Sequence, residues 1–174
     1  MKEFIKNLKE QILSGKIFIY PTDTIYGLGC NALDEGAVSK IRGIKKRDFN
    51  KPLSVIAPSI KWIKDNCIVN VDLKKYFPGP YTIVLDKKNP KFLSHVSFRE
   101  TLGIRIPAYE FTKKIQKTGI PFITTSVNLS GEPFIKKISE VPKEIKNKID
   151  FIIDYGLLSG KPSTLIINGK EIKR

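Results

Sequence analysis

The sequence lacks the features of several common protein classes. No apolar run approaches the roughly 20 residues that a membrane-spanning helix needs, so we expect no membrane segment. There are two cysteines, Cys30 and Cys67, and a single histidine, His95. With no paired spacing among these residues, neither a disulfide framework nor a metal site is expected. Nothing near His95 in the sequence resembles a catalytic triad, and we interpret it as a loop residue.

Signals of covalent catalysis and of common nucleotide-binding loops are also missing. There is no Gly-x-Ser-x-Gly elbow and no Cys–His pair, so no catalytic nucleophile is evident. The Walker pattern is absent, and Gly27 and Gly29 supply only half of the dinucleotide-binding pattern. The first 16 residues alternate charged with apolar residues, as an amphipathic helix does and a signal peptide does not. We therefore expect a cytoplasmic protein.

What the sequence has in excess is positive charge. The 174 residues include 31 lysines and arginines against 17 acidic residues, a formal net charge of +14. An excess of this size favours anionic partners such as nucleotides or nucleic acid. Because it is nearly all lysine in an isoleucine-rich chain, base composition or adaptation to heat explains it equally well. Charge alone therefore does not predict RNA binding.

The apolar segments predict one α/β domain over residues 1–174. Short β-branched runs typical of strands occur at 17–20, 53–56, 81–85, 102–106, 122–126, 151–154 and 165–167, with amphipathic segments between them. Asp34 and Ser59 are expected to cap two helices, and Gly15 and Gly119 to end two others. The N-terminal helix is expected to pack one face on the sheet, formed by Phe4, Ile5, Leu8, Ile12 and Leu13.

Two loops carry candidate binding groups. Residues 22–29 place two hydroxyls, a carboxylate and two glycines after the first strand, at the carboxyl end where open α/β sheets bind ligands. Residues 45–51 hold four cations. The helix dipole explains Lys46, whereas Lys45 and Arg47 are placed to converge on one anion. The first loop could recognise a small polar molecule, and the second could hold phosphates.

Later strands also end in polar groups. Arg105 must face solvent, a carboxylate or a bound anion, because burying it alone is too costly; a ligand carboxylate and an ordinary ion pair are equally good explanations. Ser126, Asn128 and Ser130 either satisfy their own turn or form a second polar wall. Anion binders with clustered hydroxyls can orient two substrates and stabilise charge on a transferring phosphorus. The residues alone favour a nucleotide-using ligase or nucleotidyltransferase.

Six motifs follow one another along most of the chain. They are Tyr20-Pro21-Thr22-Asp23-Thr24-Ile25-Tyr26-Gly27-Leu28-Gly29, Lys45-x-Arg47 with Lys51-Pro52-Leu53, Phe77-Pro78-Gly79-Pro80-x-Thr82, Gly103-Ile104-Arg105-Ile106-Pro107, Thr125-Ser126-Val127-Asn128-Leu129-Ser130-Gly131 and Pro162-Ser163-Thr164. In order and spacing this set resembles the YrdC-like threonylcarbamoyl-adenylate synthases. The resemblance implies a YrdC-like fold, a twisted open mixed α/β sheet flanked by helices, with a basic concave groove.

The same resemblance implies an activity. It is the synthesis of threonylcarbamoyl-adenylate and pyrophosphate from L-threonine, bicarbonate and ATP, assisted by Mg²⁺. The product serves threonylcarbamoyladenosine modification of tRNA, which partner proteins complete; direct contact of this chain with tRNA stays open. The implied roles are catalysis and triphosphate binding for Lys45 and Arg47, ATP binding for Lys51, Thr101, Ser126, Asn128 and Arg174, and threonine binding for Thr24, Arg105 and Ser163.

Four positions depart from the family pattern. Asp48 stands where the family often has proline, and its carboxylate would weaken phosphate binding or help to hold magnesium. Val127 replaces an alanine and would add bulk where a substrate passes. Tyr109 and Ile56 stand where other members carry histidine, and the change at Ile56 bears on threonine selectivity.

Two other functions compete with this interpretation. A non-catalytic module could bind double-stranded RNA or tRNA through the basic groove, favoured by the charge of +14. Aromatic residues are not interleaved with the basic runs, which counts against single-strand binding. An enzyme making a related carbamoyl-adenylate is disfavoured, because such domains normally accompany acylphosphatase-like and zinc-containing segments that these residues do not include.

Overall fold

The computed structural model describes residues 7–173 and contains one open mixed sheet. Its strands are β1 (Phe18–Tyr20), β2 (Gly27–Gly29), β3 (Ser54–Ile56), β4 (Cys67–Ile68), β5 (Tyr81–Lys87), β6 (Thr101–Arg105), β7 (Phe122–Ser126), β8 (Phe151–Ile152), β9 (Thr164–Ile167) and β10 (Lys170–Ile172). Their order is β10-β9-β5-β6-β3-β7-β2-β1-β8, with β4 paired to β5. The pairs β1–β8, β3–β6 and β5–β9 are parallel and the others antiparallel. The predicted mixed α/β sheet is confirmed.

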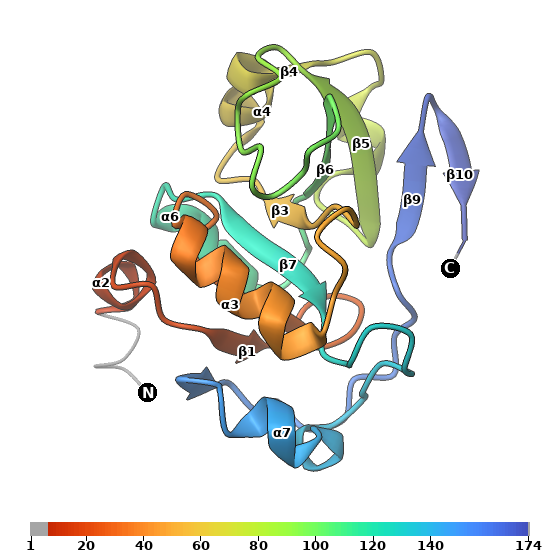
Figure 1. The fold of residues 1–174 in the computed structure, drawn as a ribbon. Coiled ribbons are helices and arrows are strands. Elements are labelled where there is room, and N and C mark those ends of the chain that lie inside the picture. Colours follow the sequence, from red (N-terminus) through yellow and green to blue (C-terminus); the bar gives the residue numbers. More distant parts are fainter. Residues whose placement is uncertain (1–6, 174) are drawn as a thin grey trace.

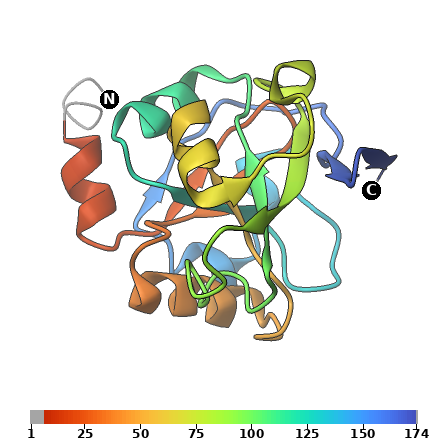
Figure 2. The ribbon, with the colours of Figure 1, turned by 90° about the horizontal axis from the view of Figure 1, so that it is seen from above.

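Helices cover both faces of the sheet (Figures 1 and 2). They are α2 (Leu8–Leu13), α3 (Glu35–Lys45), α4 (Ile60–Asn66), α5 (Leu73–Tyr76), α6 (Glu110–Lys117), α7 (Lys143–Lys146) and a 3₁₀ turn, η1 (Ile138–Glu140). Buried residues of α3, α4 and α7 belong to the larger core, whereas those of α2 and α6 belong to a second core. None of the helices within residues 7–173 has the length and apolarity to cross a membrane.

The predicted helix ends are mostly as expected. The Asp34 carboxylate accepts a hydrogen bond from the Ala37 amide at 2.9 Å, and the Ser59 hydroxyl accepts one from the Trp62 amide at 3.1 Å. In α2, Leu8 and Ile12 are buried but Leu13 is 56% exposed, so the prediction that Leu13 packs on the sheet was wrong. Phe4 and Ile5 lie outside the described residues.

The main local difference from the sequence prediction is β2. Residues 27–29 form a strand between β1 and β7, where a turn was expected. Glycine has a low β-propensity, which hid this strand. The two glycines are nevertheless required: a Cβ on Gly27 would meet the Tyr20 ring at 2.8 Å, and one on Gly29 would meet the Ile123 carbonyl oxygen at 2.0 Å. Close packing, not turn formation, explains them.

Strand β7 lies next to β3, the middle strand of the sheet, and brings several polar segments together. It pairs with β3, where Thr124 lies opposite Ser54, and with β2, where Ser126 lies opposite Gly27. On the other side of β3, Ser54 pairs with Gly103 of β6. A Cβ on Gly103 would meet the Ser54 hydroxyl at 2.5 Å, so glycine keeps this part of the sheet open. Hydroxyl groups from separate motifs thereby come together.

Candidate active site

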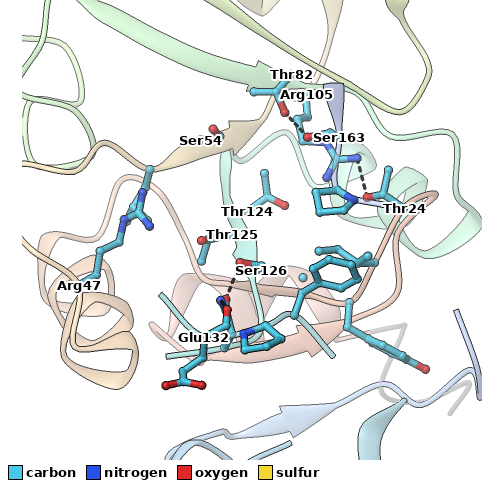
Figure 3. A pocket seen from close by; sticks show the side chains of 18 of the residues that line it. Thr24, Arg47, Ser54, Thr82, Arg105, Thr124, Thr125, Ser126, Glu132 and Ser163 are labelled. Atoms are coloured by element: carbon cyan, nitrogen blue, oxygen red, sulfur yellow. Dashed lines mark hydrogen bonds between the residues drawn. The ribbon is translucent and has the colours of Figure 1, made fainter. Parts of the chain in front are cut away.

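A cavity of about 310 Å³ lies where the loop after β1, the start of β3, the ends of β6 and β7 and the segment before β9 meet (Figure 3). Six of the residues predicted to form the site line it, namely Thr24, Arg47, Arg105, Ser126, Asn128 and Ser163. They come from five of the six sequence motifs. The fold therefore brings most of the predicted set into one place.

Arg105 is the buried cation of the cavity. Its Nη2 donates to the Asp23 carboxylate at 2.8 Å and to the Thr24 hydroxyl at 3.2 Å. The second Asp23 oxygen accepts from the Ala108 amide at 2.8 Å, which fixes the carboxylate. Burial lowers the pKa of Arg105, and the charge of Asp23 opposes that shift. The ion-pair interpretation of Arg105 is thus confirmed, and it does not exclude a ligand.

Part of the Arg105 guanidinium is left for a ligand. Its Nη1 forms no hydrogen bond within residues 7–173 and, unlike the buried Nε, is accessible. A ligand that covered Nη1 without offering an acceptor would cost about 1–3 kcal/mol, so a ligand with an acceptor at this position is favoured. Since Asp23 and Thr24 hold Nη2, the remaining nitrogens are oriented in advance.

Hydroxyl groups surround Arg105. The Thr22 hydroxyl lies 2.9 Å from that of Thr24 and donates to the Ile25 carbonyl at 2.7 Å, which shapes the loop after β1. On the opposite side, the hydroxyls of Thr82 and Ser163 lie 2.7 Å apart. Figure 3 shows Thr24, Thr82 and Ser163 grouped around Arg105. The arrangement suits a small polar molecule with a carboxylate and a hydroxyl.

Lys45 stabilises the turn after β7, which forms one wall of the cavity. The residue is 1% exposed, and its ammonium group donates to the Ser126 and Asn128 carbonyl oxygens and to the Asn128 side-chain oxygen. Burial and the nearby Arg47 lower the pKa of Lys45 to about 7, while three oxygen acceptors favour the ammonium form. Lys45 does not line the cavity. Its direct contact with phosphate stays a prediction, and its visible role is to hold this turn.

Both interpretations of the turn after β7 apply. The Ser126 hydroxyl donates to the Asn128 side-chain oxygen, and the Asn128 amide nitrogen donates to the Glu132 carbonyl. The two side chains therefore satisfy their own turn. Both also line the cavity, together with Glu132, so they form the expected second polar wall.

Arg47 is the other cation that lines the cavity. Its Nη2 donates to the Pro52 carbonyl at 2.9 Å and its Nε to the Lys51 carbonyl at 3.4 Å. Burial lowers the pKa of Arg47. Its Nη1 has no hydrogen-bond partner in the described part of the chain, so it can donate to an anion. Figure 3 places Arg47 across the cavity from Arg105, so the two guanidinium groups are well separated.

Three predicted residues lie elsewhere. The Lys51 side chain is exposed and does not line the cavity. Thr101 begins β6, at the end opposite Arg105, and also lies off the cavity. Arg174 lies outside the described residues. Their predicted contacts with ATP stay predictions.

Sequence reasoning missed several cavity residues, among them Ser54, Thr124, Glu132 and Phe134. Ser54 and Thr124 stand inside apolar strands, and the signal that could have found them is a hydroxyl in an otherwise buried run. Nothing in the sequence marks Glu132 or Phe134 except their position in the loop after the Ser126–Gly131 turn.

The departures from the family pattern have structural positions. Val127 is fully buried in the larger core and Ile56 in the second core, so neither lines the cavity; the bulk that Val127 adds lies in the core and not on the cavity surface. Asp48 is exposed, and its carboxylate accepts from the Asn50 amide at 2.9 Å. Tyr109 is half-buried and its ring lies 6.0 Å from that of Tyr155.

A strap formed by residues 154–163 carries Ser163 to the cavity. The buried Tyr26 hydroxyl donates to the Gly156 carbonyl at 2.8 Å and accepts from the Tyr155 amide at 3.0 Å. Gly160 presses against the loop after β1: a Cβ there would lie 2.0 Å from the Thr24 carbonyl oxygen. The strap is therefore fixed against the loop after β1, and Thr24 and Ser163 both line the cavity.

The fold and cavity define a class of protein, an α/β domain whose open mixed sheet carries a polar cavity with two arginines. A family model, Sua5_yciO_yrdC, described as "Telomere recombination", matches residues 10–173. The chain belongs to the Sua5/YciO/YrdC family, and the resemblance seen in its motifs is confirmed.

Individual relatives agree with this assignment. A Methanocaldococcus jannaschii protein, whose name gives the activity of a threonylcarbamoyl-AMP synthase provisionally, is 40% identical over 170 residues, covering 95% of this chain and 80% of that protein. The threonylcarbamoyl-AMP synthase of Blochmanniella floridana is 30% identical over 182 residues, covering 98% and 95%. The crystal structure of Pyrococcus abyssi Sua5 complexed with L-threonine matches with a TM-score of 0.84 and 32% identity, over 96% of this chain and 51% of that chain. This chain therefore spans about half the length of the Pyrococcus protein.

Proposed function

We propose that this chain is a threonylcarbamoyl-AMP synthase, which forms threonylcarbamoyl-adenylate and pyrophosphate from L-threonine, bicarbonate and ATP. The observation that carries the proposal is a single cavity with Arg105 on one side and Arg47 on the other. A carboxylate and a triphosphate are the two anions that this reaction must hold. Relatives named for the same activity support the synthase over a non-catalytic RNA-binding module.

In this proposal, threonine binds at the Arg105 side. Its carboxylate accepts hydrogen bonds from Arg105, chiefly from Nη1, which has no partner within residues 7–173. The Thr24 and Ser163 hydroxyls position its remaining polar groups. ATP places its triphosphate at Arg47, with Lys51 nearby, and its nucleoside along Ser126 and Asn128; Thr101 and Arg174 are additional predicted contacts.

The proposed reaction depends on how the substrates are oriented and needs no nucleophilic side chain. The threonine amine and bicarbonate condense to a carbamate with loss of water. A carbamate oxygen attacks the α-phosphorus of ATP, and the bond from that phosphorus to the pyrophosphate oxygen breaks. The fixed positive charge of Arg47 offsets the charge that develops on the transferring and leaving groups.

Magnesium enters as part of the MgATP substrate in this account. No group of three His, Cys, Asp or Glu side chains in the described part of the chain could hold a metal ion. Glu132 is the one carboxylate among the residues that line the cavity. Phosphate oxygens and water would therefore supply most ligands, as is usual for Mg²⁺.

The product is an activated carbamoyl group that another protein must use. We propose that tRNA-modifying transfer proteins consume it, and that the chain works in the cytoplasm, where ATP, threonine and tRNA occur together. The reaction itself requires no contact between this chain and tRNA.

Pyrophosphate release tests the proposal. The purified chain is incubated with MgATP and with or without L-threonine and bicarbonate. Release should require both, and Arg47→Ala should lower it at least 100-fold, because the triphosphate loses its fixed cation, an effect of about 3 kcal/mol. Lys61→Ala, which removes an exposed cation paired with Asp65 on α4, is the matched control and should leave release unchanged. Release that is independent of threonine would contradict the proposal.

A further inference from the structure

Arg42 joins two loops beside the cavity. The residue is 5% exposed, lies in the last turn of α3 and does not line the cavity. Its Nη1 donates to the Lys51 carbonyl at 2.9 Å and to the Asp48 carbonyl at 3.4 Å, both in the loop after α3. Its Nη2 donates to the Val96 carbonyl at 3.0 Å and to the His95 carbonyl at 3.2 Å, in the loop between β5 and β6. One buried side chain therefore fixes both loops.

The Lys51 carbonyl is shared between Arg42 and Arg47. The Arg47 Nε donates to the same oxygen at 3.4 Å, and the Arg47 Nη2 donates to the next carbonyl, that of Pro52, at 2.9 Å. The Arg47 amide in turn donates to the Arg42 carbonyl at 3.0 Å. Arg42 thus fixes the Arg47 backbone through its own carbonyl and the Arg47 side chain through the Lys51 oxygen.

The loop between β5 and β6 completes this support. The Val96 carbonyl, which Arg42 holds, also accepts from the Leu53 amide at 3.0 Å, directly after Pro52. Both carbonyls that hold the Arg47 side chain are therefore connected to Arg42, that of Lys51 directly and that of Pro52 through Val96.

Two aromatic rings cover the Arg42 guanidinium. The guanidinium carbon lies 5.0 Å from the centre of the Phe49 ring, and the Phe98 ring lies 4.4 Å from that of Phe49. A cation on an aromatic face is attracted to it, and covering the guanidinium limits the access of water to its hydrogen bonds. A cation in the last turn of a helix also complements the helix dipole, but the dipole requires neither burial nor contacts with other loops. The surroundings of Arg42 therefore indicate a role in holding these loops.

We propose that Arg42 is a positioning residue for the triphosphate. By holding the Lys51 carbonyl, it keeps the Arg47 guanidinium in one orientation, with Nη1 free of partners in the described chain and available to the cavity. A cation oriented before the ligand arrives binds it at a lower entropic cost. The inference rests on the proposed function, in which Arg47 binds the triphosphate, and extends that function to a residue that touches no substrate.

Calorimetric titration with inorganic pyrophosphate, which needs no turnover, tests the proposal. Arg42→Gln should raise the Kd for pyrophosphate about 10- to 100-fold, the scale expected when a binding group is displaced by about 1 Å. The Kd for L-threonine should change less than about twofold, because the Arg105 side of the cavity is untouched. Arg42→Lys keeps the charge, but one ammonium group cannot span the carbonyls of both loops, so this variant should bind pyrophosphate as weakly as Arg42→Gln.

Lys87→Gln is the matched control. Lys87 is 4% exposed, and its ammonium group donates to the Pro90 and Ser97 carbonyls at 2.7 and 3.0 Å, in the same loop between β5 and β6. The substitution removes a buried cation that holds carbonyl oxygens but has no connection to Arg47. It should lower the temperature of unfolding and leave the Kd for pyrophosphate at the wild-type value, measured where every variant is folded.

A double-mutant cycle with Arg47→Ala shows whether Arg42 acts through Arg47. Arg47→Ala alone should weaken pyrophosphate binding, and adding Arg42→Gln should change the Kd less than about twofold further, because the side chain that Arg42 positions is already gone. Equal effects of Arg42→Gln in both backgrounds, or wild-type affinity in Arg42→Lys, would overturn the proposal. Wild-type pyrophosphate affinity in Arg47→Ala would instead remove the phosphate site of the proposed function, and the role of Arg42 with it.

Discussion

The Lys45 ammonium lies 2.8 Å from the side-chain oxygen of Asn128, although 83 positions separate the two residues. The contact joins the last residue of α3 to the turn after β7. Arg47 follows two residues after Lys45 and lines the same cavity as Asn128. One buried cation therefore supports both the turn predicted to bind the nucleotide and the loop predicted to bind the triphosphate.

Lys45→Met should disrupt this support. Three partly buried oxygens would each lose one donor, and the two backbone carbonyls among them would lose the only donor that Lys45 supplies, so the free energy of unfolding should fall by about 2–4 kcal/mol and pyrophosphate release should fall with it. Lys46→Met is the matched control, because its exposed ion pair with Glu144 at 3.2 Å contributes at most about 1 kcal/mol. Denaturant titration measures both variants. An equal effect of the two substitutions would contradict the role given to Lys45.

The titration of Lys45 should appear in the pH dependence of stability. Its pKa is about 7 in the folded chain, against an ordinary value of 10.5. Between these values the unfolded chain holds more protons than the folded chain, so the free energy of unfolding should rise as pH increases from 7 to 10.5. Lys45→Met should show a smaller rise. Activity should change in the opposite direction, because the neutral amine has one donor fewer for the turn. Parallel denaturation and activity profiles from pH 6 to 10 check both signs.

Asp23→Asn should weaken threonine binding through Arg105. The substitution removes the charge of a buried ion pair whose oxygens lie 2.8 Å from Arg105 and from the Ala108 amide. Removing one partner of such a pair costs about 3–5 kcal/mol, shared here between stability and binding. We expect KM for threonine to rise at least tenfold while KM for ATP changes little. Asp65→Asn, in an exposed pair with Lys61, should change neither value. A rise in both KM values would show that Asp23 supports the whole cavity and not the threonine side.

Gly160→Ala should separate the strap from the loop after β1. The new Cβ would lie 2.0 Å from the Thr24 carbonyl oxygen, a backbone atom that cannot move aside easily. We expect loss of threonine binding and destabilisation of about 1–3 kcal/mol, the range for overpacking. Gly43→Ala is the control, because nothing lies within 4 Å of its Cβ position in α3 and alanine favours helix by about 1 kcal/mol. Thermal unfolding and calorimetric threonine titration distinguish the two. Wild-type threonine affinity in Gly160→Ala would contradict this role of the strap.

Local patterns predicted most of the elements. The caps at Asp34 and Ser59 and the strands β1, β5, β6 and β7 follow from side-chain chemistry within a few residues. Strand β2 was missed because its glycines are required by packing against Tyr20 and β7, which local propensity does not contain.

The sequence predicted which residues form the site better than it predicted what each of them does. Motif order identified Thr24, Arg47, Arg105 and Ser163, which the fold brings to one cavity. The support given by Lys45 depends on a contact across 83 positions, and no pattern near Lys45 reports it. The burial of Val127 and Ile56 likewise depends on which face of each segment meets a core.

The measurement that tests the central claim most directly is the fate of labelled bicarbonate. The purified chain is incubated with MgATP, L-threonine and ¹³C-bicarbonate, and the adenylate products are analysed by mass spectrometry. The account predicts an adenylate that contains threonine and one ¹³C atom, formed by the wild-type chain and lost in Arg105→Ala. An unlabelled threonyl-adenylate, or no threonine-containing adenylate from a chain that binds both substrates, would contradict it.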